Sequence, residues 1–186
     1  MAQIKTEVEC KGSKAKVSID LNGSGKVNLS SGSSFLDHML HTFSHTAMLD
    51  LRVQANGGHY LGEALGSAIG RALDQVLGDR SGIRRYGSSS VPMDESLANV
   101  SLDFSGRPYL IFAGEFRSEK IGDLESQQVK RFLEALADGA RLTLHVKFHG
   151  ENDHHKAESI FKALGLAVRE ATKKEGTGVP STKGLI

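Results

Sequence analysis

Histidine and glutamate residues occur in this chain at spacings that suit a bound metal ion. The sequence contains eight histidines, and in two places a histidine precedes a glutamate by four residues: His59 before Glu63, and His154 before Glu158. On a helix, residues four apart lie on the same face, so an imidazole and a carboxylate could bind one ion together. His155 would point about 100° further around that helix, toward a different ion or a neighbouring chain. The alternative for His59 and Glu63 is a solvated pair with no ion.

A further histidine and the shortage of cysteine narrow the choice of metal. His145 lies in an alternating segment in which Thr143, His145 and Lys147 would share one face of a strand. Cys10 is the single cysteine, so the ligands would be imidazole and carboxylate. Such ligands suit Mn, Fe, Zn or Co, and they argue against a calcium site, which uses oxygen ligands.

Basic residues occur in three turns rich in glycine and serine, at 81–87, 105–108 and 180–184. These turns contain Arg85, Arg107 and Lys183. Guanidinium groups and a lysine beside loop N–H groups can hold a phosphate, although an arginine in a single turn is more often simply solvated. Taken together, the turns predict a small phosphorylated substrate beside a metal centre.

Composition excludes several other classes of protein. The 186 residues are 39% hydrophobic and carry a formal net charge of +1, which gives no electrostatic reason to expect nucleic acid or a membrane surface as partner. A membrane-spanning helix needs a run of about 18 apolar residues, and no stretch of the sequence approaches that length. The N-terminal residues lack the apolar core of a signal peptide, and the single cysteine cannot form an internal disulfide. We therefore expect a cytoplasmic protein.

The elements that would position these residues occur twice along the chain. The segment 17–23 is echoed 83 positions later, and the segment 63–73 is echoed 95 positions later, so the second half contains about a dozen extra residues. Apolar periodicity predicts helices over 35–46, 61–77, 127–136 and 155–172, with strands before the second and fourth, over 49–54 and 142–148. We expect an α/β (α+β) sandwich in which a sheet layer packs on a helix layer. The whole chain, 1–186, would form one domain of two similar halves, about 1–90 and 91–186.

Seven segments in a fixed order carry a resemblance to a known family. They are Phe35-Leu-Asp-His-Met-Leu40 with His45 after it, Gly82-Ile-Arg-Arg-Tyr-Gly87, Val91-Pro-Met-Asp-Glu95, Asp103-Phe-Ser-Gly-Arg-Pro-Tyr109, Leu142-Thr-Leu-His145, Asp153-His-His-x-x-Glu158 and Pro180-Ser-Thr-Lys-Gly184. Together they resemble imidazoleglycerol-phosphate dehydratase, from about residue 17 to the C-terminus. This lyase of histidine biosynthesis converts D-erythro-imidazole-glycerol phosphate to imidazole acetol phosphate and water.

The resemblance implies a shell of twenty-four subunits, with two Mn²⁺ ions per active site at the subunit interfaces. It implies that His59, Glu63, His145 and His155 hold one ion, and that His45, His154 and Glu158 hold the other. Glu158, with His45 and Glu63, would form the catalytic set, and Glu158 would move the proton. The substrate phosphate would contact Arg85, Arg107, Ser181 and Lys183, with Lys162 as an auxiliary contact.

The first half departs from the family pattern at two positions. The family has His-His-x-x-Glu in both halves, but here Tyr60 follows His59. A phenol with a pKa near 10 binds metal less readily than an imidazole, so a single ion per site is the alternative to two. A substrate-facing glutamate that the family places ahead of the first strand aligns with Gly12, and Glu7 or Glu9 could replace it only with a shift in register.

The expected chemistry is loss of water from a substrate whose imidazole is bound to metal as imidazolate. The positive charge of the metal ions beside the ring favours the imidazolate form, and the electron density of that ring can then expel the ring-adjacent hydroxyl. The alternatives are a degenerate family member with one metal and little or no activity, a non-catalytic metal-binding shell protein, and a metallohydrolase. The phosphate-binding turns argue against a storage shell, and no spare general base stands beside an open metal position for hydrolysis.

Overall fold

Two halves of the chain repeat one order of elements in the structure, a computed structural model that describes residues 4–182. The first half consists of β1 (Ile4–Cys10), β2 (Ser13–Asp20), β3 (Val27–Ser30), α1 (Ser34–Ala47), β4 (Asp50–Ala55) and α2 (Leu61–Leu77). The second half consists of β5 (Tyr86–Met93), β6 (Ser96–Asp103), β7 (Tyr109–Ala113), β8 (Lys120–Ile121), β9 (Leu124–Glu125), α3 (Gln127–Gly139), β10 (Thr143–His149) and α4 (Asp153–Ala171).

The two four-stranded sheets have the same topology, which confirms the predicted duplication. Their strand orders are β1-β2-β4-β3 and β5-β6-β10-β7, and in each sheet only the last pair is parallel. The repeated sequence segments fall on β2 and β6 and on α2 and α4, which occupy equivalent places. The exception to the repeat is the β8–β9 hairpin, which lies between β7 and α3 and accounts for the extra residues of the second half.

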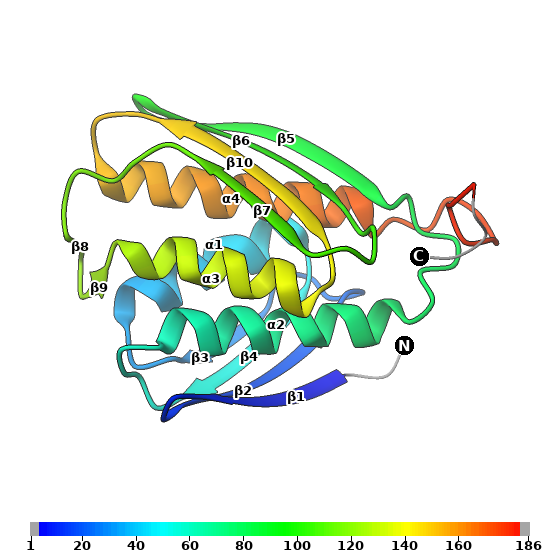
Figure 1. The fold of residues 1–186 in the computed structure, drawn as a ribbon, viewed down its shortest axis with the longest axis horizontal. Helices are drawn as coiled ribbons and strands as arrows, with labels where there is room; N and C mark the ends of the chain where they lie inside the picture. Colours follow the sequence, from blue (N-terminus) through cyan, green and yellow to red (C-terminus); the bar gives the residue numbers. More distant parts are fainter. Residues whose placement is uncertain (1–3, 183–186) are drawn as a thin grey trace.

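The helices lie between the two sheets (Figure 1). Helix α2 packs on β1 and β2, and α4 packs on β5 and β6, so each half is a sheet covered by helices, as predicted. The halves meet through their helices, because α2 packs against α3 and α1 packs against α4. Each sheet therefore has one face on the helices and one facing outward. On β10, for example, Leu144, Val146 and Phe148 are buried while His145 and Lys147 are exposed.

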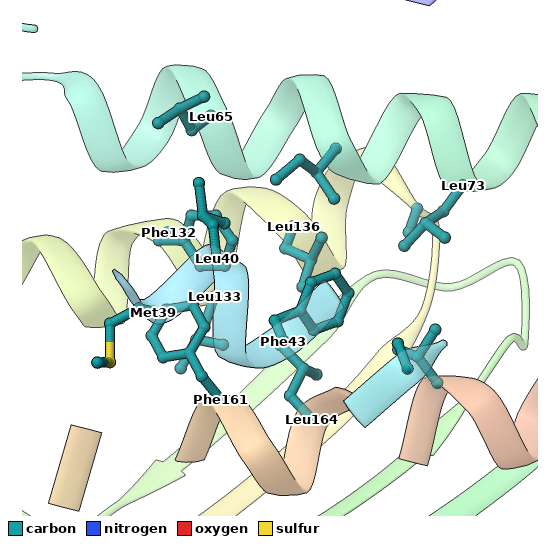
Figure 2. Close-up of a cluster of buried hydrophobic side chains, with 14 of the residues drawn as sticks. Met39, Leu40, Phe43, Leu65, Leu73, Phe132, Leu133, Leu136, Phe161 and Leu164 are labelled. Carbon is teal, nitrogen blue, oxygen red and sulfur yellow. The ribbon is translucent and has the colours of Figure 1, made fainter. Parts of the chain in front are cut away.

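All four helices contribute side chains to the apolar core. Figure 2 shows Phe43 of α1, Leu65 of α2, Phe132 of α3 and Phe161 of α4 in one cluster of buried side chains. The rings of Phe132 and Phe161 have their centroids 5.3 Å apart. The buried apolar residues of both halves belong to one cluster, so neither half has a separate core.

Glycines allow the helices of the two halves to approach closely. Gly62, Gly66 and Gly70 lie on successive turns of α2, and a Cβ atom at any of them would clash with a backbone carbonyl oxygen of α3. At the other helix pair, a Cβ at Gly165 of α4 would lie 2.6 Å from the carbonyl oxygen of Phe43. Backbone therefore meets backbone where the halves join.

None of the helices found between residues 4 and 182 has the length and apolar content that crossing a membrane requires.

Candidate active site

A group of three potential metal ligands lies where α1 and α4 face each other. His38 Nε2 and His154 Nε2 each lie 3.3 Å from Glu158 Oε2. The predicted spacing of His154 and Glu158 does place them on one face of α4. The start of that helix is well defined, because the side chain of Asn152 accepts hydrogen bonds from the backbone N–H groups of His154 and His155. One ligand atom from each member of the group lies within 4.8 Å of the others, which suits a single divalent ion.

Glu158 is the buried member of this group and is ionised at neutral pH. Lys162, one turn further along α4, lies 2.9 Å from its Oε1 atom. Burial raises the pKa of Glu158, but the hydrogen bonds from Lys162 and His38 outweigh burial and hold its pKa below the ordinary value. The carboxylate is therefore available both to bind a cation and to accept a proton.

His38 occupies the place in this group that the resemblance assigned to His45. Seven residues separate them on α1, so His45 lies about 10 Å further along the helix axis. There it is exposed and lines a hollow of about 240 Å³ together with His38, His41 and Lys162, so the hollow adjoins the group of three ligands. Among residues 4–182, the group that could hold an ion contains His38 and not His45.

His155 points away from this group and meets the turn between β5 and β6. Its Nδ1 lies 2.8 Å from Glu95 Oε2, and its Nε2 lies 3.7 Å from Asp94 Oδ2. The hydrogen bond to Glu95 raises the pKa of His155, and the same bond lowers the pKa of Glu95 well below its ordinary value. His154 and His155 therefore contact different groups, as expected for adjacent residues on a helix, whose side chains point in different directions.

The ligands expected in the first half are arranged differently from their counterparts in α4. His59 lies in the turn before α2, so the helical spacing predicted for His59 and Glu63 does not apply, and the His59 ring lies instead 3.7 Å from Glu125. Glu63 is in the first turn of α2, and its buried Oε2 atom has no hydrogen-bond partner among the described residues. The rings of Tyr60 and His59 meet edge to face. The ammonium group of Lys11 lies over the Tyr60 ring, 4.6 Å from its centroid.

The outer face of the second sheet holds the remaining expected ligand, His145. It is exposed on β10, with Ser101 of β6 and Ile111 of β7 as its register neighbours. Because the helices cover the opposite face of that sheet, His145 is not brought to His59, Glu63 or His155 within the described subunit.

Three segments expected to hold phosphate do converge, at the C-terminal end of α4. The Arg85 guanidinium binds both carboxylate oxygens of Asp103, at 2.6 and 3.0 Å, and donates to the Pro180 carbonyl at 2.8 Å. The turn that contains Arg107 follows Asp103 directly, and the Arg107 side chain is exposed. Ser181 follows Pro180 in the chain, and Lys183 lies outside the described residues.

This basic end lies far from the His38, His154 and Glu158 group. The backbone N–H of Arg85 binds the carbonyl of Ala171, the last residue of α4. Glu158 lies thirteen residues earlier on that helix, a separation of about 20 Å along the axis. The Arg85 segment and the Glu158 group therefore lie toward opposite ends of α4.

The β8–β9 hairpin caps α1, the helix that carries His38. In the turn of the hairpin, Asp123 accepts hydrogen bonds from the backbone N–H groups of Ser34 and Phe35, at 2.7 and 3.1 Å, and from the hydroxyl of Ser33 at 2.8 Å. Burial raises the pKa of Asp123, but these hydrogen bonds outweigh it and lower the pKa from 3.8 to about 2. Neither Asp123 nor Glu95 was assigned a role from sequence, because their partners lie far away in the chain.

Replacing Asp123 with asparagine is expected to destabilise the protein in a pH-dependent way. Asn cannot accept at both side-chain atoms, so the loss at pH 7 should be about 1 kcal/mol, typical of a helix cap. The native pKa is below the unfolded value, so the stabilisation is complete above pH 4 and is lost as the pH falls through 2. Thermal unfolding of both proteins at pH 7, 4 and 2 would test this, and an unfolding-temperature difference that does not shrink with acid would contradict it.

Fold and site together define an internally duplicated α/β protein with a candidate metal site of imidazole and carboxylate ligands. The model of the imidazoleglycerol-phosphate dehydratase family matches residues 31–168 of this chain. The chain is 47% identical over 176 residues to the imidazoleglycerol-phosphate dehydratase of Methanothermobacter thermautotrophicus, covering 92% of this chain and 91% of that protein. It is 46% identical over 178 residues to the Acetivibrio thermocellus protein of the same name, covering 91% of each.

Solved structures agree with these sequence comparisons. The Staphylococcus aureus imidazoleglycerol-phosphate dehydratase superposes with a TM-score of 0.85 at 34% identity, covering 93% of this chain and 99% of that one. The Pyrococcus furiosus enzyme superposes with a TM-score of 0.86 at 35% identity, covering 97% and 100%. The chain belongs to the imidazoleglycerol-phosphate dehydratase family, as the sequence motifs predict.

Proposed function

We propose that this protein is a metal-dependent lyase that removes water from D-erythro-imidazole-glycerol phosphate to give imidazole acetol phosphate, a step of histidine biosynthesis. Near-full-length similarity to enzymes of that name supports the reaction. The single observation that carries the metal dependence is the convergence of His38, His154 and Glu158, which come from two helices 120 positions apart in sequence.

The donor set fits a divalent cation of the Mn²⁺ type. His38, His154 and Glu158 would hold one ion, and His45 in the adjoining hollow remains a proposed further ligand of it. His59, Glu63, His145 and His155 remain the proposed ligands of a second. The buried, unpartnered Oε2 atom of Glu63 supports a cation there, because a buried carboxylate oxygen without a partner is costly. When bound, the cations supply positive charge that stabilises negative charge on the substrate's imidazole ring.

Glu158 is the residue that we propose for proton transfer. In the reaction the hydroxyl on the carbon next to the ring leaves, and the neighbouring carbon loses a proton to give an enol that becomes the ketone. Glu158 is ionised, and its carboxylate contacts His38, His154 and Lys162, so it can accept that proton. Lys162, 2.9 Å away, would keep the carboxylate oriented and charged.

The phosphate would be held by a neighbouring subunit. Arg85, Arg107, Ser181 and Lys183 remain its proposed contacts, with Lys162 as the auxiliary contact. The Arg85 segment lies about 20 Å along α4 from Glu158 of the same chain, whereas Lys162 lies 2.9 Å from Glu158 Oε1. The exposed His145 is likewise not grouped with the other proposed ligands of its ion among the described residues, so those ligands would come from a neighbouring subunit. We therefore propose a homo-oligomer with shared active sites. The twenty-four-subunit shell and the cytoplasmic location stay predictions.

A second candidate function rests on Tyr60. Its ring contacts the His59 ring and the ammonium group of Lys11, in the position where the family has a ligand histidine. If this site holds no ion, the protein is a family member with one metal and little or no dehydratase activity.

Turnover of imidazole glycerol phosphate by metal-stripped protein, with and without Mn²⁺, tests both candidates. We expect the keto product only when Mn²⁺ is added, together with two bound ions per subunit. Folded protein that binds one ion and forms no product would support the second candidate. Product formation in the continued absence of any divalent ion would contradict the metal dependence.

A further inference from the structure

We propose that Glu95 is a positioning residue that holds the His155 ring in the orientation and tautomer needed to bind a metal ion. This inference rests on the proposed function, in which His155 is a ligand. Glu95 lies in the turn between β5 and β6, sixty residues before His155, and the two side chains meet only because β6 and α4 are adjacent in the fold.

The contact leaves one ring nitrogen available. Glu95 Oε2 lies 2.8 Å from His155 Nδ1. An ionised carboxylate only accepts hydrogen bonds, so the proton must be on Nδ1 and the lone pair of a neutral ring must be on Nε2. A ligand histidine commonly donates its second ring N–H to a carboxylate in this way, which fixes the tautomer and increases the basicity of the ligand atom.

The other oxygen of Glu95 is held firmly by the backbone. Oε1 accepts hydrogen bonds from the backbone N–H groups of Asn152 at 2.8 Å and Glu151 at 3.2 Å, and from the Ser96 hydroxyl at 2.8 Å. Asn152 in turn caps α4 through the N–H groups of His154 and His155. The carboxylate is thus anchored at the start of the ligand helix, and its free oxygen is directed at the His155 ring.

Space for this arrangement depends on Gly150. A Cβ atom at that position would clash with the hydroxyl of Ser96, one of the groups that bind Glu95. The backbone of Gly150 also has a φ of 152°, which side chains disfavour. The loop before α4 is therefore shaped to let the β5–β6 turn approach.

A purely structural role for Glu95 would make a different prediction. In that role the contacts of Oε1 with the backbone N–H groups of Glu151 and Asn152 would be the important ones, and an amide oxygen could make the same contacts. Only the contact through Oε2 distinguishes a carboxylate from an amide. Glutamine at position 95 can keep the backbone hydrogen bonds while presenting an NH₂ group to His155. That group donates, so it favours the tautomer with the lone pair on Nδ1 and the proton on Nε2.

The test is Mn²⁺ binding to the full-length metal-free protein, measured by electron paramagnetic resonance of the free ion, for the wild type, Glu95→Gln and His155→Ala. The variant His155→Ala identifies the class of Mn²⁺ binding site in which His155 is a ligand. We expect Glu95→Gln to weaken Mn²⁺ binding at that same class of site by about 10–100-fold and to leave the affinity of the other class of site unchanged. The unfolding temperature of the metal-free protein should also stay the same. Ser96→Ala is the matched control, since it removes a hydrogen bond from Oε1 and leaves the His155 contact in place.

The possible failures are distinguishable. A wild type that binds no Mn²⁺, or a His155→Ala variant that binds as the wild type does, would overturn the proposed ligand role and this inference with it. Wild-type Mn²⁺ affinity in Glu95→Gln, with His155→Ala weakened, would overturn this inference alone. Equal weakening of both classes in Glu95→Gln and Ser96→Ala, together with a lower unfolding temperature, would assign Glu95 a structural role only.

Discussion

Replacing Glu158 with glutamine is expected to lower kcat for imidazole glycerol phosphate by about 10²–10⁴-fold, the usual contribution of a proton-transferring residue. The amide keeps the size of the side chain but can neither accept the proton nor carry the charge. Because Oε2 lies 3.3 Å from both His38 and His154, the substitution also removes the anionic member of the proposed ligand group.

Steady-state kinetics with saturating Mn²⁺, together with Mn²⁺ binding, would separate the two effects. Activity that recovers fully at high Mn²⁺ would show that Glu158 only binds metal, and undiminished kcat would exclude it from the chemistry. Glu134→Gln on α3 is a suitable control because Glu134 is an exposed carboxylate and we expect no change there.

Replacing Arg80 with methionine is expected to destabilise the protein by about 3 kcal/mol. Arg80 follows α2 and is only 2% exposed. It lies 2.6 Å from Asp74 Oδ1 and donates to the carbonyl of Ala140, the C-cap residue that follows α3. Removing one partner of a buried ion pair costs about 3–5 kcal/mol because the other charge is left uncompensated. Asp74 keeps some contact with water, which places the expected loss at the lower end.

Thermal unfolding at equal subunit concentrations would measure this loss. A change of 3 kcal/mol corresponds to a fall in Tm of roughly 6–12 °C for a chain of this size. Arg84→Met is the matched control, because the Arg84 side chain is 44% exposed and its ion pairs with Glu170 and Glu175 are worth little. Equal falls in Tm for the two variants would contradict the assigned role of Arg80.

Much of the fold could be predicted because four helices have a clear apolar period. Helix α2 has the predicted bounds, 61–77, and α4 begins two residues before the predicted start. Strands β3 and β7 were not predicted, since they are four and five residues long and alternate between half-buried and exposed positions. The hairpin of β8 and β9 has two residues per strand, too few for any period to appear.

The site could be predicted only where its residues belong to one element. His154 and Glu158 are four residues apart on a helix, so the spacing alone places them together. His59 is four residues from Glu63, but the helix begins at Leu61 and the same spacing has no such meaning. The contact of His38 with Glu158 joins elements far apart in the chain, and no local pattern contains that information.

The glycines of α2 have a consequence for Glu63, the proposed ligand on that helix. At Gly62, Gly66 and Gly70 the main chain of α2 touches that of α3. The position of the Glu63 backbone relative to α3 is therefore set by contact between main chains and not by the size of side chains. Substitutions that exchange one core side chain for another of similar volume can accumulate without changing that position. A single added methyl group at Gly66 would push the two helices apart, and would move Glu63 from a residue that is not itself a proposed ligand.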